Sequence, residues 1–116
     1  MKNSIRISFM IFSLILISSS LTFPQGFNSI HTPDGINVIA VGDAGKVFRS
    51  SNSGNSWASY TTPSVNFRSV FSKNNDVWIS GNNGKIYKTL KTNSPMSSYD
   101  VGVTTSLNSV CFADEL

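Results

Sequence analysis

The sequence predicts an all-β fold of repeated units, on the strength of two alignments and a turn pattern. Residues 37–50 align with residues 76–89 at an offset of 39 residues, with four identical and six conservative positions in fourteen. A second set of similar segments recurs every 40 residues, at 27–30, 67–70 and 107–110. Short apolar runs alternate with turns rich in glycine, asparagine and proline, and no stretch has helical periodicity. Short strands in a repeat of about 40 residues are typical of a β-propeller blade, so we predict about two blades of four antiparallel strands plus the first strand of a third.

The first unit, residues 27–66, contains four predicted strands. The second of them is almost entirely apolar, which indicates a strand buried on both faces. A proline, an aspartate and a glycine at 33–35 favour reversal of the chain before it. Gly42 and Gly45 delimit a second turn, where glycine tolerates positive φ. The strands are therefore expected at 27–31, 37–41, 46–49 and 57–61.

The second unit, residues 67–106, repeats this order, with Gly81 and Gly84 at the equivalent turn. Residues 107–116 begin a third unit. Because a closed propeller takes about 4 to 8 blades, we expect either an N-terminal part of a longer chain or several chains that close a ring together. The strands are expected at 67–71, 77–80 and 85–89, within 96–103, and at 107–112.

Residues 1–20 have the pattern of a secretory signal peptide. Two basic residues precede an apolar run at 7–17, and three serines follow it. The run is shorter than the ~20 residues that a membrane span needs, so a cleaved signal is favoured over a membrane anchor. Residues 21–26 are a short lead-in to the first unit. We therefore predict an exported protein of bacterial type, periplasmic, cell-surface or extracellular, with no stable membrane span after cleavage.

Charge and cysteine content narrow the classes of function. The formal net charge is +3, and removal of Lys2 and Arg6 with the signal leaves seven basic and six acidic side chains, a balance of +1. A chain so weakly charged lacks the dense basic face that nucleic acid requires, so we predict no nucleic-acid partner. Cys111 is the only cysteine, so no disulfide can form within the chain.

The segment after the third strand contains a conspicuous polar box. Ser50, Asn52, Gly54, Ser56 and Trp57 follow the spacing Ser-x-Asp-x-Gly-x-Thr-Trp, with asparagine in place of aspartate and serine in place of threonine. A short polar side chain at the third position can bond neighbouring amides, glycine permits positive φ, and the indole covers the turn. The box resembles the Asp-box of sialidase-type (BNR), sortilin-type and photosystem II assembly factor-type propellers.

The order of the elements is most similar to the photosystem II stability/assembly factor-type repeat. A phrase Leu-x-x-Val-x-Phe at 107–112, the Gly-x-x-Gly turn and the box carry this resemblance, which covers residues 27–116. The second copy of the box, at 89–96, keeps only a threonine and an asparagine of the pattern. The resemblance implies a propeller in which the box is structural and lies away from the binding surface, and a scaffold that binds protein.

Groups that could support catalysis are few. Sialidase chemistry, which the resemblance also brings into consideration, uses three arginines, a tyrosine nucleophile and acidic partners. After the signal, the chain has only Arg49 and Arg68, and its single glutamate is Glu115. The aspartates lie in predicted turns or near the end of the sequence, where turn formation explains them. We therefore predict no catalytic residue and no cofactor.

The single histidine does not indicate a metal site. His31 aligns with Phe71 and Cys111 in the repeat, which predicts a packed strand position. One histidine and one cysteine without ligand spacing give no support for a metal ion, and Cys111 is expected to be a small core residue.

Basic residues repeat on the third strand of each unit, where Lys46 and Arg49 correspond to Lys85 and Lys88. Stacked units could align them into a stripe that holds an anionic partner, or they could be ordinary solvated strand residues. The aromatic residues could likewise form a surface for carbohydrate or pack within the sheets. The sequence thus predicts an exported, non-catalytic propeller scaffold that binds protein. The rival interpretations are the non-catalytic blades of a sialidase-like or other glycoside hydrolase, and a lectin-like oligomer of short chains.

Overall fold

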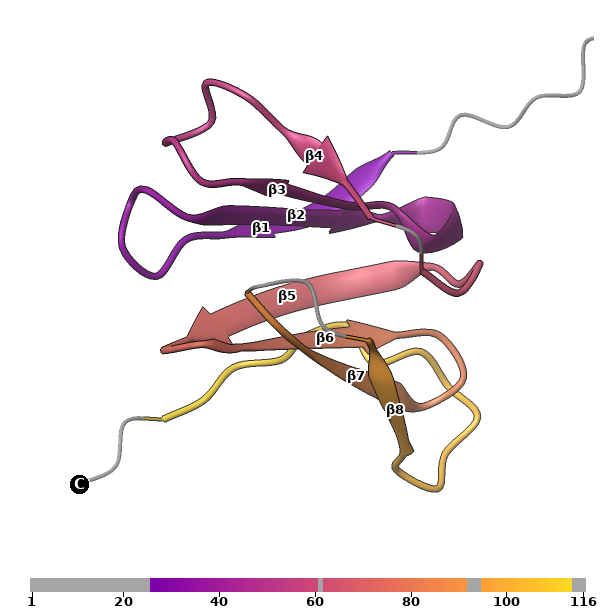
Figure 1. Ribbon diagram of the computed structural model, residues 1–116. Coiled ribbons are helices and arrows are strands. Elements are labelled where there is room, and N and C mark those ends of the chain that lie inside the picture. The colour runs from indigo at the N-terminus through magenta and orange to yellow at the C-terminus, as the bar shows by residue number, and fades with distance from the viewer. Residues whose placement is uncertain (1–25, 61, 92–94, 114–116) are drawn as a thin grey trace, which may run out of the picture.

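The computed structural model describes residues 26–60, 62–91 and 95–113 (Figure 1). These residues form two four-stranded antiparallel sheets, one with the strand order β1-β2-β3-β4 and the other β5-β6-β7-β8. We call them sheet A and sheet B. Each sheet is a meander in which every strand pairs with the one before it in the chain. The prediction of an all-β fold with four antiparallel strands in each unit is confirmed.

The observed strands lie close to the predicted ones, with one clear difference in sheet A. The expected fourth strand at 57–61 contains only a two-residue strand, because β4 pairs with β3 at two positions alone and both of its residues are exposed. A short 3-10 turn, η1 (Asp43–Gly45), joins β2 to β3. The strands are β1 (Phe27–His31), β2 (Val38–Gly42), β3 (Val47–Ser50), β4 (Ala58–Ser59), β5 (Phe67–Lys73), β6 (Asp76–Gly81), β7 (Lys85–Leu90) and β8 (Ser97–Asp100).

The expected first strand of a third unit is not a strand in the structure. Residues 107–112 run along sheet B without entering a ladder. The backbone N–H of Leu107 donates to the carbonyl of Gly81, and that of Val110 donates to Ser69 Oγ. In the two complete units the first strand pairs with the second, and the described part of the chain supplies no such partner for this segment. Cys111 is accordingly exposed, and its expected place in the core is wrong.

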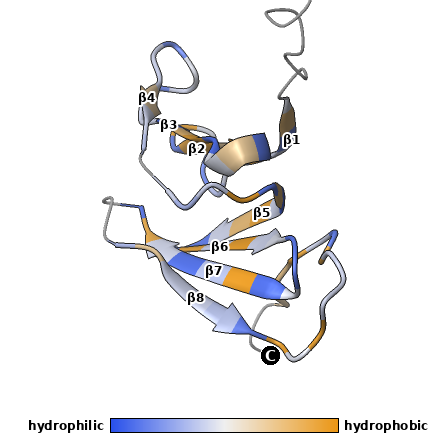
Figure 2. Ribbon diagram, turned by 90° about the vertical axis from the view of Figure 1, so that its right-hand side faces the viewer, coloured by the Kyte–Doolittle hydropathy of each residue, from blue (hydrophilic) through white to orange (hydrophobic). Residues whose placement is uncertain are grey.

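The core lies between the two sheets. β5 contacts both β1 and β2, so one face of sheet A covers one face of sheet B. We call the covering face of sheet A its rear face and the covered face of sheet B its front face. The apolar stretches of both sheets are visible in Figure 2. The buried residues of this core are Ile39, Val41 and Val47 from sheet A, and Phe67, Val70, Val77, Ile79 and Tyr87 from sheet B.

The predicted signal peptide and most of the lead-in lie outside the described residues. Within the part of the chain that is described, no helix has the length and apolar character needed to span a membrane.

Candidate functional site

The box after β3 is a closed network of short hydrogen bonds. Ser50 Oγ accepts from the backbone N–H of Gly54 at 2.8 Å and donates to Asn52 Oδ1 at 2.9 Å. The same oxygen of Asn52 accepts from the backbone N–H of Ser56 at 2.9 Å, while its Nδ2 donates to Ser56 Oγ. Gly54 has φ +86°, which permits the turn. Because these groups bond to one another, the box has a structural role.

Trp57 completes the box. Its indole N–H donates to the carbonyl of Gly54 at 3.0 Å, and its ring lies against the same glycine. The side chain is nevertheless 42% exposed, because the rest of the ring lies over the face of sheet A that points away from sheet B. The tryptophan therefore belongs to the turn and to an apolar surface at the same time. The equivalent positions in the second unit fall partly at 92–94, outside the described residues.

Replacement of Asn52 tests the box directly. We expect Asn52→Ala to lower the free energy of unfolding by about 1 kcal/mol, because the N–H of Ser56 loses its acceptor. Asn52→Asp should be nearly neutral, since a carboxylate oxygen can accept the same hydrogen bonds. Urea denaturation followed by tryptophan fluorescence would measure both. Equal losses for the two variants would contradict the acceptor role.

The second glycine of each Gly-x-x-Gly turn holds the connection that leads into the next unit. Gly45 and Gly84 have φ of +74° and +63°. Gly45 N donates to Val65 O at 2.7 Å, and Gly84 N donates to Thr105 O at 2.8 Å. A Cβ on Gly84 would lie 2.0 Å from the carbonyl oxygen of Val103. This position therefore needs glycine both for its backbone angle and for the close approach.

The first glycine of each turn lies close to backbone atoms and does not have positive φ. Gly42 is in extended backbone, so the expectation of positive φ does not apply to it. A Cβ on Gly42 would lie 2.1 Å from the carbonyl oxygen of Gly26, and one on Gly81 would lie 3.2 Å from that of Asn66. Both turns thus pack on the residue that precedes the first strand of their own unit.

Polar side chains gather at the end of the molecule that carries these turns. We call this group, which consists of Asn28, Asp43, Arg68, Asn82 and Ser106, the polar rim. Asn28 Nδ2 donates to Asp43 Oδ1 at 2.9 Å, and at the equivalent place Arg68 Nε donates to Asn82 Oδ1 at 3.1 Å. Ser106 Oγ donates to the same oxygen of Asn82 at 2.9 Å. The rim residues come from the start of each first strand, from each glycine turn and, for Ser106, from the segment after β8, and the bonds between them hold their orientation.

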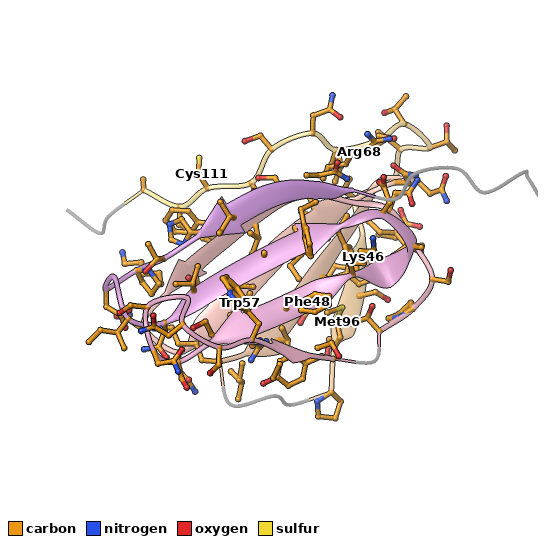
Figure 3. The ribbon with its side chains drawn as sticks, turned by 90° about the horizontal axis from the view of Figure 1, so that it is seen from above. Lys46, Phe48, Trp57, Arg68, Met96 and Cys111 are labelled. Carbon is orange, nitrogen blue, oxygen red and sulfur yellow. The ribbon has the colours of Figure 1, made fainter. Side chains whose placement is uncertain are left out.

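The rim has a defined charge. The hydrogen bond from Asn28 lowers the pKa of Asp43, and the charges of Arg68 and Lys46 act in the same direction. Asp43 is therefore ionised at neutral pH, beside a fixed guanidinium. The rim and the box lie at opposite ends of β3, because η1 precedes this strand and the box follows it. Figure 3 shows Arg68 and Lys46 on one side of the molecule and Trp57 nearer its middle.

Two of the four predicted stripe residues form ion pairs within sheet B. Lys85 Nζ lies 3.7 Å from a carboxylate oxygen of Asp100, and Lys88 Nζ lies 3.1 Å from one of Asp76. Lys88 also lies over the ring of Trp78, 5.1 Å from its centroid. Their charges are therefore partly neutralised by their own sheet.

The other two stripe residues do not continue a stripe. Arg49 is only 8% exposed, since it projects from the rear face of sheet A towards β7 and donates from Nη1 to the carbonyl of Leu90. Lys46 lies over the ring of Phe27, 5.7 Å from the ring centroid. Stacking of the second sheet therefore buries Arg49, so the four residues do not form a continuous exposed stripe among the described residues.

His31 joins the two sheets. Its Nδ1 accepts from the backbone N–H of Ser72 at 3.1 Å and lies 2.9 Å from Ser72 Oγ. Its ring packs on Phe71 with centroids 4.6 Å apart. Burial of the ring and the nearby charge of Lys91 lower the pKa of His31. The expected packed strand position is confirmed, and the described residues form no group of three or more potential metal ligands.

The geometry of His31 predicts a pH dependence. Because the pKa of His31 in the folded chain lies below the ordinary histidine value of about 6.5, its stabilising contribution is complete above about pH 6.5 and is lost as the pH falls through the folded pKa. We expect the melting temperature to fall between pH 7 and pH 5, measured by circular dichroism. His31→Phe, which copies Phe71, should remove most of this slope. The same pH dependence in the wild type and in His31→Phe would contradict the assignment of this slope to His31.

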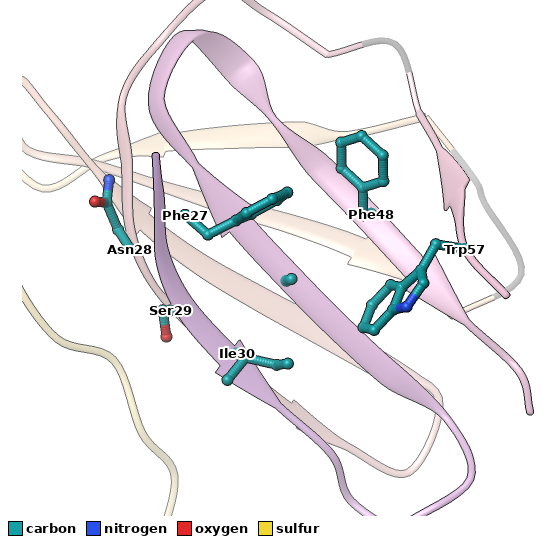
Figure 4. Close-up of a pocket in the computed structure, with 7 residues that line it drawn as sticks. Phe27, Asn28, Ser29, Ile30, Phe48 and Trp57 are labelled. Atoms are coloured by element: carbon teal, nitrogen blue, oxygen red, sulfur yellow. The ribbon is translucent and has the colours of Figure 1, made fainter. Parts of the chain in front are cut away.

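The face of sheet A that points away from sheet B is open and apolar. It bounds a cavity of about 620 Å³, shown in Figure 4. We call this surface the front face of sheet A. The rings of Phe27 and Phe48 meet edge to face on it, 5.4 Å apart. Its apolar residues are Phe27, Ile30, Ala40, Phe48 and Trp57.

Comparison with known protein families, characterised proteins and solved structures gave no match for this chain. The candidate site therefore rests on geometry alone, and the polar rim is the part that sequence reasoning missed. A signal for it was present, since the repeat alignment places Asn28, Arg68 and Asn108 at one polar position beside a conserved Phe/Leu position. The partner residues Asp43 and Asn82 also align.

Proposed function

We propose that this chain is part of an exported, non-catalytic β-propeller scaffold whose polar rim binds a protein partner. One observation carries the proposal: the joint between units occurs twice. Ser29 Oγ accepts from the N–H of Val70 at 3.2 Å, and Ser69 Oγ accepts from the N–H of Val110 at 3.3 Å. A joint repeated at equivalent residues stacks successive units in one direction, as the blades of a propeller do.

The open front face of sheet A supports a longer stack. Its residues Phe27, Ile30 and Phe48 align with Phe67, Val70 and Tyr87, all of them core residues of sheet B. In sheet B this face is covered by the preceding unit, whereas in sheet A it is exposed. An apolar face of this kind favours cover by another unit of the same repeat. The box after β3 also supports a propeller, since it resembles the Asp-box of propeller repeats.

The polar rim is suited to contact with a protein. It presents a carboxylate, a guanidinium and amides, and each is fixed by a hydrogen bond to its neighbour. Pre-oriented polar groups lose little conformational freedom on binding. A sialidase clamp uses three arginines, and the two that follow the predicted signal make other contacts, Arg49 between the sheets and Arg68 with Asn82. These contacts support a non-catalytic role for the described units, as a binding scaffold and the non-catalytic blades of a hydrolase would both have.

Site-specific photo-crosslinking in the exporting cell tests this function. A photoreactive amino acid at position 68 should give discrete adducts of protein mass, while the same residue at Asn55, exposed in the box at the other end, should give none. The mass of the exported protein should show loss of residues 1–20. Equal labelling from both positions, or none from position 68, would argue against the rim as a protein-binding surface.

A further inference from the structure

A second, smaller cavity of about 110 Å³ lies where sheet A meets the end of β7. It is distinct from the open front face, because it is bounded by the rear side of β3 and by the residue that follows β7. Two cationic side chains line it, together with hydroxyl and amide groups. The polar residues of its lining are Asn37, Arg49, Ser50, Ser51, Tyr60 and Lys91.

Arg49 is a buried charge without a counter-charge among the described residues. One hydrogen bond runs from Nη1 to the carbonyl of Leu90, and the guanidinium carbon lies 5.0 Å from the ring centroid of Tyr60. Nε is buried and has no hydrogen-bond partner in the described part of the chain. A buried cation is costly unless an anion compensates it. The described protein groups supply only a carbonyl dipole and an aromatic face.

Comparison of the two units shows that a negative charge is missing beside Arg49. Arg49 corresponds to Lys88 in the second unit, and Asn37 corresponds to Asp76. In the second unit the cation and the carboxylate form an ion pair at 3.1 Å. In the first unit the equivalent of the carboxylate is a neutral amide, so the same arrangement of strands lacks its negative charge.

Asp34, the carboxylate on which the charge of Lys91 acts, does not fill this role. The hydrogen bonds from Asn37 lower the pKa of Asp34, and the charge of Lys91 acts more weakly in the same direction. Asp34 is engaged by its own turn, where it accepts from the N–H of Ile36, the N–H of Asn37 and Asn37 Nδ2. It is also absent from the lining of the cavity.

We propose that this cavity binds a small oxyanion between the guanidinium of Arg49 and the ammonium of Lys91. The anion takes the place that a carboxylate has in the second unit. A cavity of about 110 Å³ suits a single phosphate, sulfate or carboxylate group, and a guanidinium pairs well with each of them. The site depends on these residues alone and is independent of protein binding at the polar rim.

The test uses inorganic phosphate as the probe, at constant ionic strength set with sodium chloride. We expect the melting temperature to rise saturably, by about 5 °C at a tenfold excess over the Kd. Acetate in a parallel titration distinguishes a carboxylate ligand from a tetrahedral one. Lys91→Met should abolish the response, whereas Lys85→Met, which removes a lysine paired with Asp100, should retain it.

A charge-neutral exchange gives the sharpest control. The double variant Asp34→Asn/Asn37→Asp moves one carboxylate to the position that Asp76 has in the second unit. It should melt at a higher temperature than the wild type without phosphate and should no longer respond to phosphate. A phosphate response that survives in this variant and in Lys91→Met would be a general salt effect and would overturn the site. No response in the wild type to either anion would also overturn it.

Discussion

Phe67→Ala should lower the free energy of unfolding by about 4 kcal/mol. Phe67 is fully buried between the sheets, where its ring meets that of Tyr87 edge to face at 5.3 Å. Truncation leaves a cavity that the two sheets cannot close without moving apart, so the loss includes both the transfer and the cavity terms. Urea denaturation followed by far-UV circular dichroism would measure it. Phe67→Leu, expected to cost no more than about 1.5 kcal/mol, keeps the test informative if the alanine variant does not fold.

The repeat supplies a matched control for this prediction. Phe27 occupies the equivalent position in sheet A but is 56% exposed. Phe27→Ala should therefore cost less than about 1 kcal/mol in dilute protein, because little apolar area leaves the core. Similar losses for Phe27→Ala and Phe67→Ala would show that the two sheets do not stack as the structure has them.

Gly84→Ala should be destabilising by about 3 kcal/mol. The new Cβ would lie 2.0 Å from the carbonyl oxygen of Val103, and the residue would have to keep φ near +63°. Relief of the clash would break the bond from Gly84 N to the carbonyl of Thr105, which holds the connection into residues 107–113. The melting temperature and the amide hydrogen exchange of residues 101–107 would both report the change.

A second glycine separates the cost of the positive φ from the cost of the close contact. Gly102 also has positive φ, +84°, but a Cβ there would meet no atom within 4 Å. Gly102→Ala should therefore show only the cost of the backbone angle, about 1 kcal/mol. If the two variants were equally stable, the close contact with Val103 would have no energetic weight.

Much of the fold was predictable because its signals are local. The apolar run before Gly42 predicts β2, the glycine turns predict the reversals, and the 39-residue offset places the same elements in sheet B. The box was also predictable, since the side-chain hydrogen bonds of Ser50 and Asn52 join residues within a few positions of each other. Propensity and turn chemistry act over such short distances, so a sequence displays them directly.

The candidate sites were less predictable. The repeat of Lys46 and Arg49 as Lys85 and Lys88 left two interpretations open, a basic stripe or ordinary solvated residues, and a stripe requires that all four are exposed. Arg49 is covered by the second sheet, whereas Lys88 projects from the rear of that sheet and pairs with Asp76. The polar rim was missed for the same reason, because Asn28 and Asp43 meet only when the first strand and the turn are brought together.

The sequence by itself determined most of the strands, the turns, the box and the equivalence of the two units. The tertiary structure decided which of two equivalent residues is buried: Phe67 and not Phe27, Arg49 more than Lys88. The physical reason is that a repeat carries nearly the same local chemistry in each copy, while burial depends on whether a neighbouring unit covers that copy. Hydrophobic energy and the cost of an unpaired charge both follow burial. Stacking of the sheets therefore buries one residue of each equivalent pair and leaves the other more exposed.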